Sequence, residues 1–115
     1  MHLTTLAGLA PYEAPGHFGM TAFRLQGQDA TPNHSFWCGL SRFAPGGGAE
    51  RSASALERVY VLIDGCITVI TDDGEHELQP LDSCRIAPGE MRSLINRGAV
   101  AATMLVIGES ARAAS

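Results

Sequence analysis

The sequence contains no lysine. All eight basic residues among its 115 residues are arginine, and twelve acidic residues bring the net charge to −4. Proteins that bind a nucleic-acid backbone or an anionic membrane surface usually carry a cluster of positive charge. The composition therefore argues against nucleic acid and membrane as partners, and a small neutral or anionic ligand stays open.

Long hydrophobic runs are absent as well. No run approaches the roughly 20 apolar residues that a membrane-spanning helix needs. Residues 1–14 show neither a basic leader nor a clear small-residue cleavage site. We therefore expect a cytoplasmic protein. The length allows one modest hydrophobic core and is too short for two, so we expect a single domain.

Cysteine is scarce. Cys38, Cys66 and Cys84 are odd in number and widely spaced, with no CxxC pair among them. Disulfide frameworks and zinc knuckles need paired or closely spaced cysteines, so we expect free thiols packed in the core. A metal site in which His34 converges with the three cysteines stays open as a rival interpretation.

Amphipathic helical patterns and internal repeats are also missing. Thirteen glycines and six prolines divide the sequence into short runs rich in valine, isoleucine, leucine and threonine, a composition typical of strands. The runs predict strands over residues 20–25, 34–43, 91–96 and 101–108, and a hairpin over residues 58–71.

Turn and loop residues separate these runs. The hairpin over 58–71 is expected to turn at Asp64-Gly65, and Asp72-Asp73-Gly74 marks the next turn. Residues 44–49, with the sequence APGGGA, predict a loop, because proline lacks a backbone donor and glycines make the chain too permissive for a strand to continue. Short strands in this arrangement indicate a sandwich or a barrel.

From Pro45 onward the sequence carries two sets of residues at definite spacings. In the first, Gly46 is followed by Ser52-Ala53-Ser54, Arg58 and Gly65, and in the second, Asp82 is followed by Pro88-Gly89, Arg92 and Asn96. These spacings resemble the two motifs of a small single-domain cupin. In that family the first motif has a glycine, His-x-His, a glutamate and a second glycine, and the second has an aspartate, a Pro-Gly turn, a histidine and an asparagine.

The resemblance implies an all-β fold, a small double-sheet jelly-roll barrel. It predicts an N-terminal arm and first strand in residues 1–33, the cupin barrel in residues 34–108 and a tail in residues 109–115. Small cupins resemble one another in forming dimers through their sheets, so the resemblance also implies a homodimer.

Every position of the family's metal ligands is changed in this sequence. Ser52, Ser54, Arg58 and Arg92 stand where two histidines, a glutamate and a third histidine would bind the metal. Serine hydroxyls are poor transition-metal ligands, and a guanidinium stays protonated and repels a cation. We therefore expect no metal at this position and no cofactor.

In this register Arg58 and Arg92 point into the barrel, where two like charges need a counter-charge. One hypothesis is a ligand carboxylate, phosphate or sulfate, held by the arginines with help from Ser52 and Ser54. The alternative is internal pairing, without any ligand, by nearby carboxylates: Glu50, Glu57, Asp82 and Glu90.

Strand alternation assigns the remaining candidates. Tyr60 and Leu62 share the parity of Arg58 and are expected inside, whereas Glu57 faces the other way. Tyr60 is either a proton-transfer group or a core aromatic whose hydroxyl reaches a neighbour. Trp37 and Phe43 predict core or dimer contacts. The histidines His2, His17, His34 and His76 fall outside the motifs and are expected at the surface or satisfied.

Three functions remain open. The first is a metal-free cupin that binds a small anionic molecule in an accessory role, with Arg58, Arg92, Ser52, Ser54 and Tyr60 as ligand-binding residues. The second is a metal-independent isomerase, epimerase or lyase acting on a small carboxylate, which lacks an obvious base with a pKa near neutrality. The third is a structural dimerisation domain.

Overall fold

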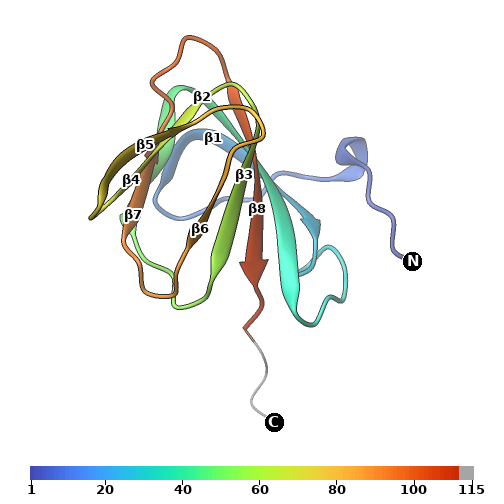
Figure 1. Ribbon diagram of the computed structural model, residues 1–115. Coiled ribbons are helices and arrows are strands. Elements are labelled where there is room, and N and C mark those ends of the chain that lie inside the picture. The colour runs from blue at the N-terminus through green and yellow to red at the C-terminus, as the bar shows by residue number, and fades with distance from the viewer. Residues whose placement is uncertain (112–115) are drawn as a thin grey trace.

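The computed structural model describes residues 1–111, and nearly all regular structure in them is β (Figure 1). A single turn of 3-10 helix, η1 (Leu6–Gly8), precedes the strands. The strands are β1 (His17–Gln26), β2 (Phe36–Ser52), β3 (Arg58–Asp64), β4 (Ile67–Thr71), β5 (Gly74–Leu78), β6 (Ser83–Ile86), β7 (Arg92–Ile95) and β8 (Ala102–Glu109). The predicted all-β class and jelly-roll barrel are confirmed.

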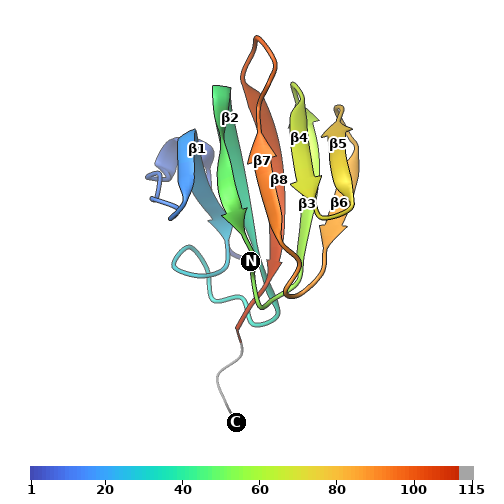
Figure 2. The same cartoon turned by 90° about the vertical axis from the view of Figure 1, so that its left-hand side faces the viewer.

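One long strand organises the sheet. The strands follow one another in the order β5-β4-β7-β2-β8-β3-β6, and β1 pairs with the free side of β2. Residues 36–43 of β2 pair with β8, whereas residues 48–52 pair with β7. The sheet folds over along β2, so that β4, β5 and β7 face β3, β6 and β8 across the interior (Figure 1, Figure 2).

The loop predicted over residues 44–49 is wrong, because β2 runs through this segment. The strand pairs with β8 up to Phe43 and with β7 from Gly48 onward, so its backbone stays hydrogen-bonded while it changes partner. A Cβ atom on Gly48 would lie 2.0 Å from the carbonyl oxygen of Leu94. The glycines therefore permit a close approach of two strands instead of ending one.

The hairpin predicted over residues 58–71 is also wrong, although both of its strands exist. β3 pairs with β6 and β8, whereas β4 pairs with β5 and β7. Gly65, at φ 78°, turns the chain from one half of the barrel to the other, and a Cβ there would lie 2.5 Å from the carbonyl oxygen of Ala101. The next turn, at Asp72-Asp73, does close a hairpin between β4 and β5.

Alternating side chains from both halves of the barrel form the core. On β3, Tyr60 is 2% exposed and Leu62 is fully buried, which confirms the predicted parity. Trp37 and Phe43 are core residues, as expected. Burial of a side chain such as Leu62 stabilises the fold by about 1.5–3 kcal/mol. The other core residues are Ala49, Ile67, Val69, Leu78, Ile86, Leu94, Ala102, Met104 and Val106.

Two further sequence predictions concern the ends of the fold. No helix within residues 1–111 is long and apolar enough to cross a membrane. The predicted tail begins with Glu109, which is the last residue of β8. Residues 112–115 of that tail lie outside the described residues.

Candidate functional site

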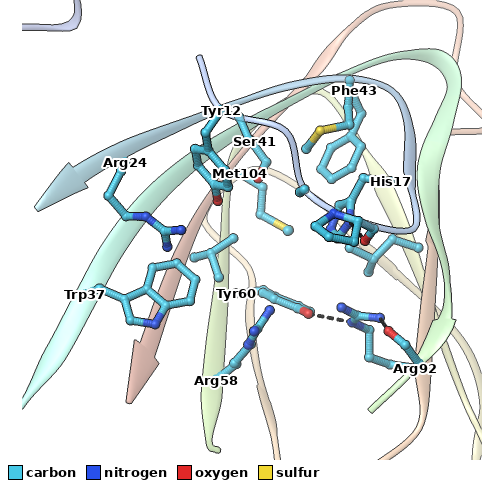
Figure 3. Close-up of a pocket in the computed structure, with 17 residues that line it drawn as sticks. Tyr12, His17, Arg24, Trp37, Ser41, Phe43, Arg58, Tyr60, Arg92 and Met104 are labelled. Carbon is cyan, nitrogen blue, oxygen red and sulfur yellow. Dashed lines mark hydrogen bonds between the residues drawn. The ribbon is translucent and has the colours of Figure 1, made fainter. Parts of the chain in front are cut away.

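A cavity of about 250 Å³ lies inside the barrel, and five strands together with the N-terminal segment line it (Figure 3). Its size is near the lower end of ligand pockets, which hold about 300–1,000 Å³. No aspartate or glutamate is among the lining residues in the described part of the chain. The polar lining residues are Tyr12, His17, Arg24, Ser41, Ser52, Arg58, Tyr60 and Arg92.

Arg92 is built into the cavity wall. It begins β7, is 6% exposed and lies opposite Ser52 in the ladder between β2 and β7. Its Nε donates to Tyr60 Oη at 2.7 Å, and its Nη1 donates to Ser52 Oγ at 2.7 Å and to the Glu50 carbonyl oxygen at 3.4 Å. Neutral acceptors therefore fix the guanidinium in place without cancelling its charge.

The same contacts define what Tyr60 can do. Its hydroxyl oxygen must accept in the bond from Arg92, because a guanidinium N–H can only donate. The phenolic proton of Tyr60 is therefore left for another acceptor. Tyr60 lines the cavity, and its hydroxyl points toward Arg92 in Figure 3.

Arg24 and Arg58 border the other end of the cavity, beside Trp37 (Figure 3). The Arg24 guanidinium carbon lies 4.4 Å from the ring centroids of both Tyr12 and Trp37, and that of Arg58 lies 5.4 Å from the Trp37 centroid. Cation–π contacts of this kind hold a guanidinium in position but leave its formal charge uncompensated.

Ion pairing occurs elsewhere on the molecule. Within residues 1–111 the arginines in ion pairs are Arg51 with Asp72, Arg85 with Glu57, and Arg97 with Glu75, all with exposed side chains. None of the three arginines that line the cavity is among them. The cavity thus gathers positive charge while the paired arginines lie on the outside.

The alternative of internal pairing of Arg58 and Arg92 by nearby carboxylates is not found within residues 1–111. Glu57 faces outward and binds Arg85, in agreement with its predicted parity. Asp82 accepts from the Gln79 backbone N–H at 2.9 Å, and Glu90 accepts from that of Ala87 at 2.9 Å. Glu50 is exposed and offers Arg92 its carbonyl oxygen, with no carboxylate contact.

The structure brings together four of the five predicted ligand-binding residues: Ser52, Arg58, Tyr60 and Arg92. Ser54 is not among the residues that line this cavity. Its hydroxyl oxygen accepts from the Leu56 backbone N–H at 3.1 Å, which stabilises the turn before β3. The second serine of the motif is thus a turn residue in this chain.

His17 lines the cavity, although it was expected to be an ordinary surface or satisfied histidine. Its Nδ1 lies 2.9 Å from the Pro15 carbonyl oxygen, which can only accept. The proton must therefore be on Nδ1, and Nε2 of the neutral ring carries a free lone pair. Burial lowers the pKa of His17, and the charges of Arg92 and Arg58 lower it further against the opposing effect of the Pro15 hydrogen bond.

The residues at the cupin metal position do not fit a metal ion. Two hydroxyls and two guanidinium groups offer neither an imidazole nor a carboxylate, and the guanidinium charge repels a divalent cation. Within residues 1–111, no three histidine, cysteine or acidic side chains lie close enough to hold a metal. A site formed by His34 and the cysteines is therefore not assembled.

The cysteines are free and half-buried. Burial raises the pKa of the Cys38 thiol, and burial together with the charge of Glu90 raises that of Cys84. Both thiols are therefore protonated at neutral pH, which makes them poor nucleophiles and poor metal ligands.

The barrel matches solved cupin structures over nearly its whole length. The polyketide cyclase RemF of Streptomyces resistomycificus has a TM-score of 0.85 at 16% identity, over 99% of this chain and 82% of that one. An RmlC-like cupin from Shewanella frigidimarina has a TM-score of 0.80 at 18% identity, over 97% and 93% of the two chains. At such identities the likeness shows the cupin fold alone.

One curated relative is much closer in sequence. The β-D-galactosidase Rv1717 of Mycobacterium tuberculosis is 42% identical over 106 residues, which cover 92% of this chain and 91% of the relative. No protein-family model matches the sequence. The chain belongs to the family of this mycobacterial protein, and its fold is that of the cupins.

Proposed function

We propose that the barrel cavity binds, without a metal, a small carbohydrate-derived molecule that carries a negatively charged group. One observation carries the proposal: Arg24, Arg58 and Arg92 line a cavity to which the described residues contribute no carboxylate. Charges of one sign in a partly dehydrated space are costly unless an opposite charge accompanies them. A ligand carboxylate or phosphate supplies that charge.

The side chains offer complementary roles in binding. Arg92 is held rigidly by Tyr60 and Ser52, so little conformational entropy is lost when an anion binds beside it. Arg58 has no ion-pair partner within the described residues, and its planar fork suits an oxygen pair of a carboxylate or phosphate. The hydroxyl of Tyr60 adds a donor for a sugar oxygen.

The carbohydrate part of the proposal rests on the mycobacterial relative, which is a β-D-galactosidase by name. The cavity of about 250 Å³ suits a molecule of monosaccharide size. Its aromatic side chains are Tyr12, Trp37, Phe43 and Tyr60. Apolar walls with a few converging polar groups are typical of sites that orient small ligands.

Calorimetry with three related sugars tests the proposal: galactose, galacturonate and galactose 6-phosphate. We expect both anions to bind at least tenfold more tightly than neutral galactose. Replacement of one charge-assisted contact in Arg58→Gln should weaken anion binding by about 10- to 100-fold. Arg51→Gln is the matched control, because Arg51 is exposed and paired with Asp72. The proposal would be overturned if the wild type and Arg58→Gln bound the anionic sugars equally well. It would also be overturned if the wild type bound galactose as tightly as the two anions.

Hydrolysis of β-D-galactosides is a second candidate, favoured by the 42% identity to the named galactosidase. Glycosidases generally use two carboxylates and stabilise a cationic transition state, whereas the described cavity lining has arginines and no carboxylate. The proton donor or nucleophile would then be Tyr60. Release of nitrophenol from nitrophenyl β-D-galactoside, lost in Tyr60→Phe, supports this candidate, and no release by the wild type excludes it.

A further inference from the structure

Two lining residues are suited to proton transfer, beyond the arginines that the proposed binding uses. His17 carries its proton on Nδ1, bonded to the Pro15 carbonyl oxygen, so Nε2 is the ring's proton acceptor. Tyr60 accepts from Arg92 through its oxygen and keeps its own proton to donate. Both residues border the same cavity, His17 from the start of β1 and Tyr60 from β3 (Figure 3).

The sign of the cavity charge restricts the reactions that such a pair can catalyse. Removal of a proton from a carbon next to a carbonyl group places negative charge on the carbonyl oxygen. Guanidinium groups fixed near that oxygen stabilise the developing charge. Cleavage of a glycosidic bond instead develops positive charge on the sugar ring, which Arg58 and Arg92 oppose.

We propose that His17 is the general base and Tyr60 the proton donor of a proton transfer next to the carbonyl group of an anionic sugar. This inference rests on the proposed function, because the arginines must first bind the anionic substrate. The reaction class is an aldose–ketose isomerisation or an epimerisation. No metal, oxidant or reductant takes part.

For an open-chain aldose, all protons and electron pairs that move in the reaction are exchanged between the sugar, His17 and Tyr60. Nε2 of His17 takes the proton from C2, the C–H electron pair forms the C1–C2 double bond, and O1 takes the Tyr60 proton. The proton on His17 then moves to C1, while the proton on O2 returns to the Tyr60 oxygen, and the ketose leaves. The hydrogen bond donated by Arg92 stabilises the Tyr60 phenolate between the two stages.

Other charged and titratable groups around His17 fit this role. Burial lowers the pKa of His17 and favours the neutral, basic form of the ring, and Arg92 of β7 and Arg58 of β3 favour that form further. Tyr12 lies on the segment before β1 and lines the cavity. Glu50 of β2 lies beside the bend at Gly16 and is exposed. No described carboxylate lines the cavity with His17 to hold it protonated.

Deuterium exchange tests the inference. Galactose 6-phosphate and galacturonate are incubated with the protein in deuterium oxide, and NMR follows deuterium at C2 and formation of the ketose. Removal of a general base typically costs about 10²- to 10⁴-fold in rate, so we expect His17→Asn to exchange at least about 100-fold more slowly than the wild type. His76→Asn, an exposed histidine on β5, is the control and should exchange normally.

Binding and pH dependence separate the possible outcomes. Calorimetry should show His17→Asn binding both sugars within about threefold of the wild type, since the arginines remain. The wild-type rate should rise with pH through a pKa below the ordinary 6.5 of histidine. This rise should persist at a lower overall rate in Tyr60→Phe, which keeps His17, and should be absent in His17→Asn. Binding without exchange in the wild type, or equal exchange by His17→Asn, overturns the proton-transfer role and leaves the binding proposal standing. If the wild type binds neither sugar, or binds them without help from the arginines, both the binding proposal and the proton-transfer role are overturned.

Discussion

Arg92 Nε and Tyr60 Oη are joined by a 2.7 Å hydrogen bond between residues 32 positions apart. Arg92 lies on β7 and Tyr60 on β3, and these strands belong to opposite halves of the barrel. The bond therefore links the halves across the cavity. It makes the guanidinium part of the wall, so stability and ligand binding depend on the same pair.

Tyr60→Phe should destabilise the protein, because it leaves the buried Nε–H of Arg92 without its acceptor. An unsatisfied buried donor costs about 1–3 kcal/mol, and urea unfolding measures the loss. Arg97→Gln is the control, since its pair with Glu75 is exposed and exposed pairs contribute little to stability. A Tyr60→Phe protein as stable as the wild type would show that the bond contributes nothing.

Asn96→Ala should be among the most damaging single substitutions. Asn96 is 1% exposed, its Nδ2 donates to the carbonyl oxygens of Phe43 and Val100 at 3.1 and 2.9 Å, and its Oδ1 accepts from the Gly98 N–H at 2.9 Å. Loss of the side chain leaves the buried carbonyl oxygen of Phe43, and the partly buried backbone groups of Val100 and Gly98, without these partners. An unsatisfied buried group costs about 1–3 kcal/mol. Chemical unfolding should give a loss of about 2–4 kcal/mol; a loss as small as that of Arg97→Ala, its exposed neighbour, would refute this role.

Gly108→Ala should displace Trp37. A Cβ atom on Gly108 would lie 2.3 Å from Cε2 of the indole, which is too close for any side chain. Overpacking of this kind costs about 1–3 kcal/mol. Since Trp37 is the only tryptophan in the chain, its fluorescence reports the displacement directly. Combining Gly108→Ala with Trp37→Phe should be less destabilising than the sum of the two changes, and strict additivity would contradict the contact.

Composition predicted an all-β sandwich or barrel, the resemblance to cupins implied the jelly-roll barrel, and alternation predicted the inward side chains of β3. The inward direction of Arg58, Tyr60 and Leu62 could be predicted from their even spacing, because side chains alternate strictly along an unbroken strand. The strand through residues 44–49 could not be predicted, since its glycines are required by the approach of Leu94 on a distant strand. The sequence of residues 44–49 alone does not show that a distant strand packs against these glycines.

His17 was missed for a related reason. The pairing of β1 with β2 shifts register between Phe18 and Met20, where Gly19 adopts φ 57°. A bulge of this kind reverses the alternation, so His17 lines the same cavity as Met20 and Arg24 despite opposite parity in the sequence.

The expected homodimer depends on a partner chain and stays a prediction, which sedimentation at micromolar concentration will test.

Purified protein should contain no stoichiometric zinc, iron, nickel or manganese, because the cupin ligand positions present hydroxyls and guanidinium groups. Native mass spectrometry of one sample reports both metal and any retained small anion. Loss of a retained anion in Arg58→Gln, with its retention in Arg51→Gln, would tie the anion to the cavity. Stoichiometric metal bound to the folded wild type would contradict the expected chemistry.

The stability of the protein should fall in mildly acidic solution through His17. Because burial and the neighbouring arginines lower its pKa below the ordinary 6.5, the unfolded chain takes up this proton first as the pH falls. Unfolding is then favoured from about pH 6.5 down to the lowered pKa, and above pH 6.5 the effect vanishes. NMR titration of the ring should give a midpoint below 6.5 in the folded protein, and His17→Asn should lose less stability than the wild type between about pH 7.5 and pH 5. A midpoint at or above 6.5 would show that burial and the neighbouring arginines do not lower the pKa of His17.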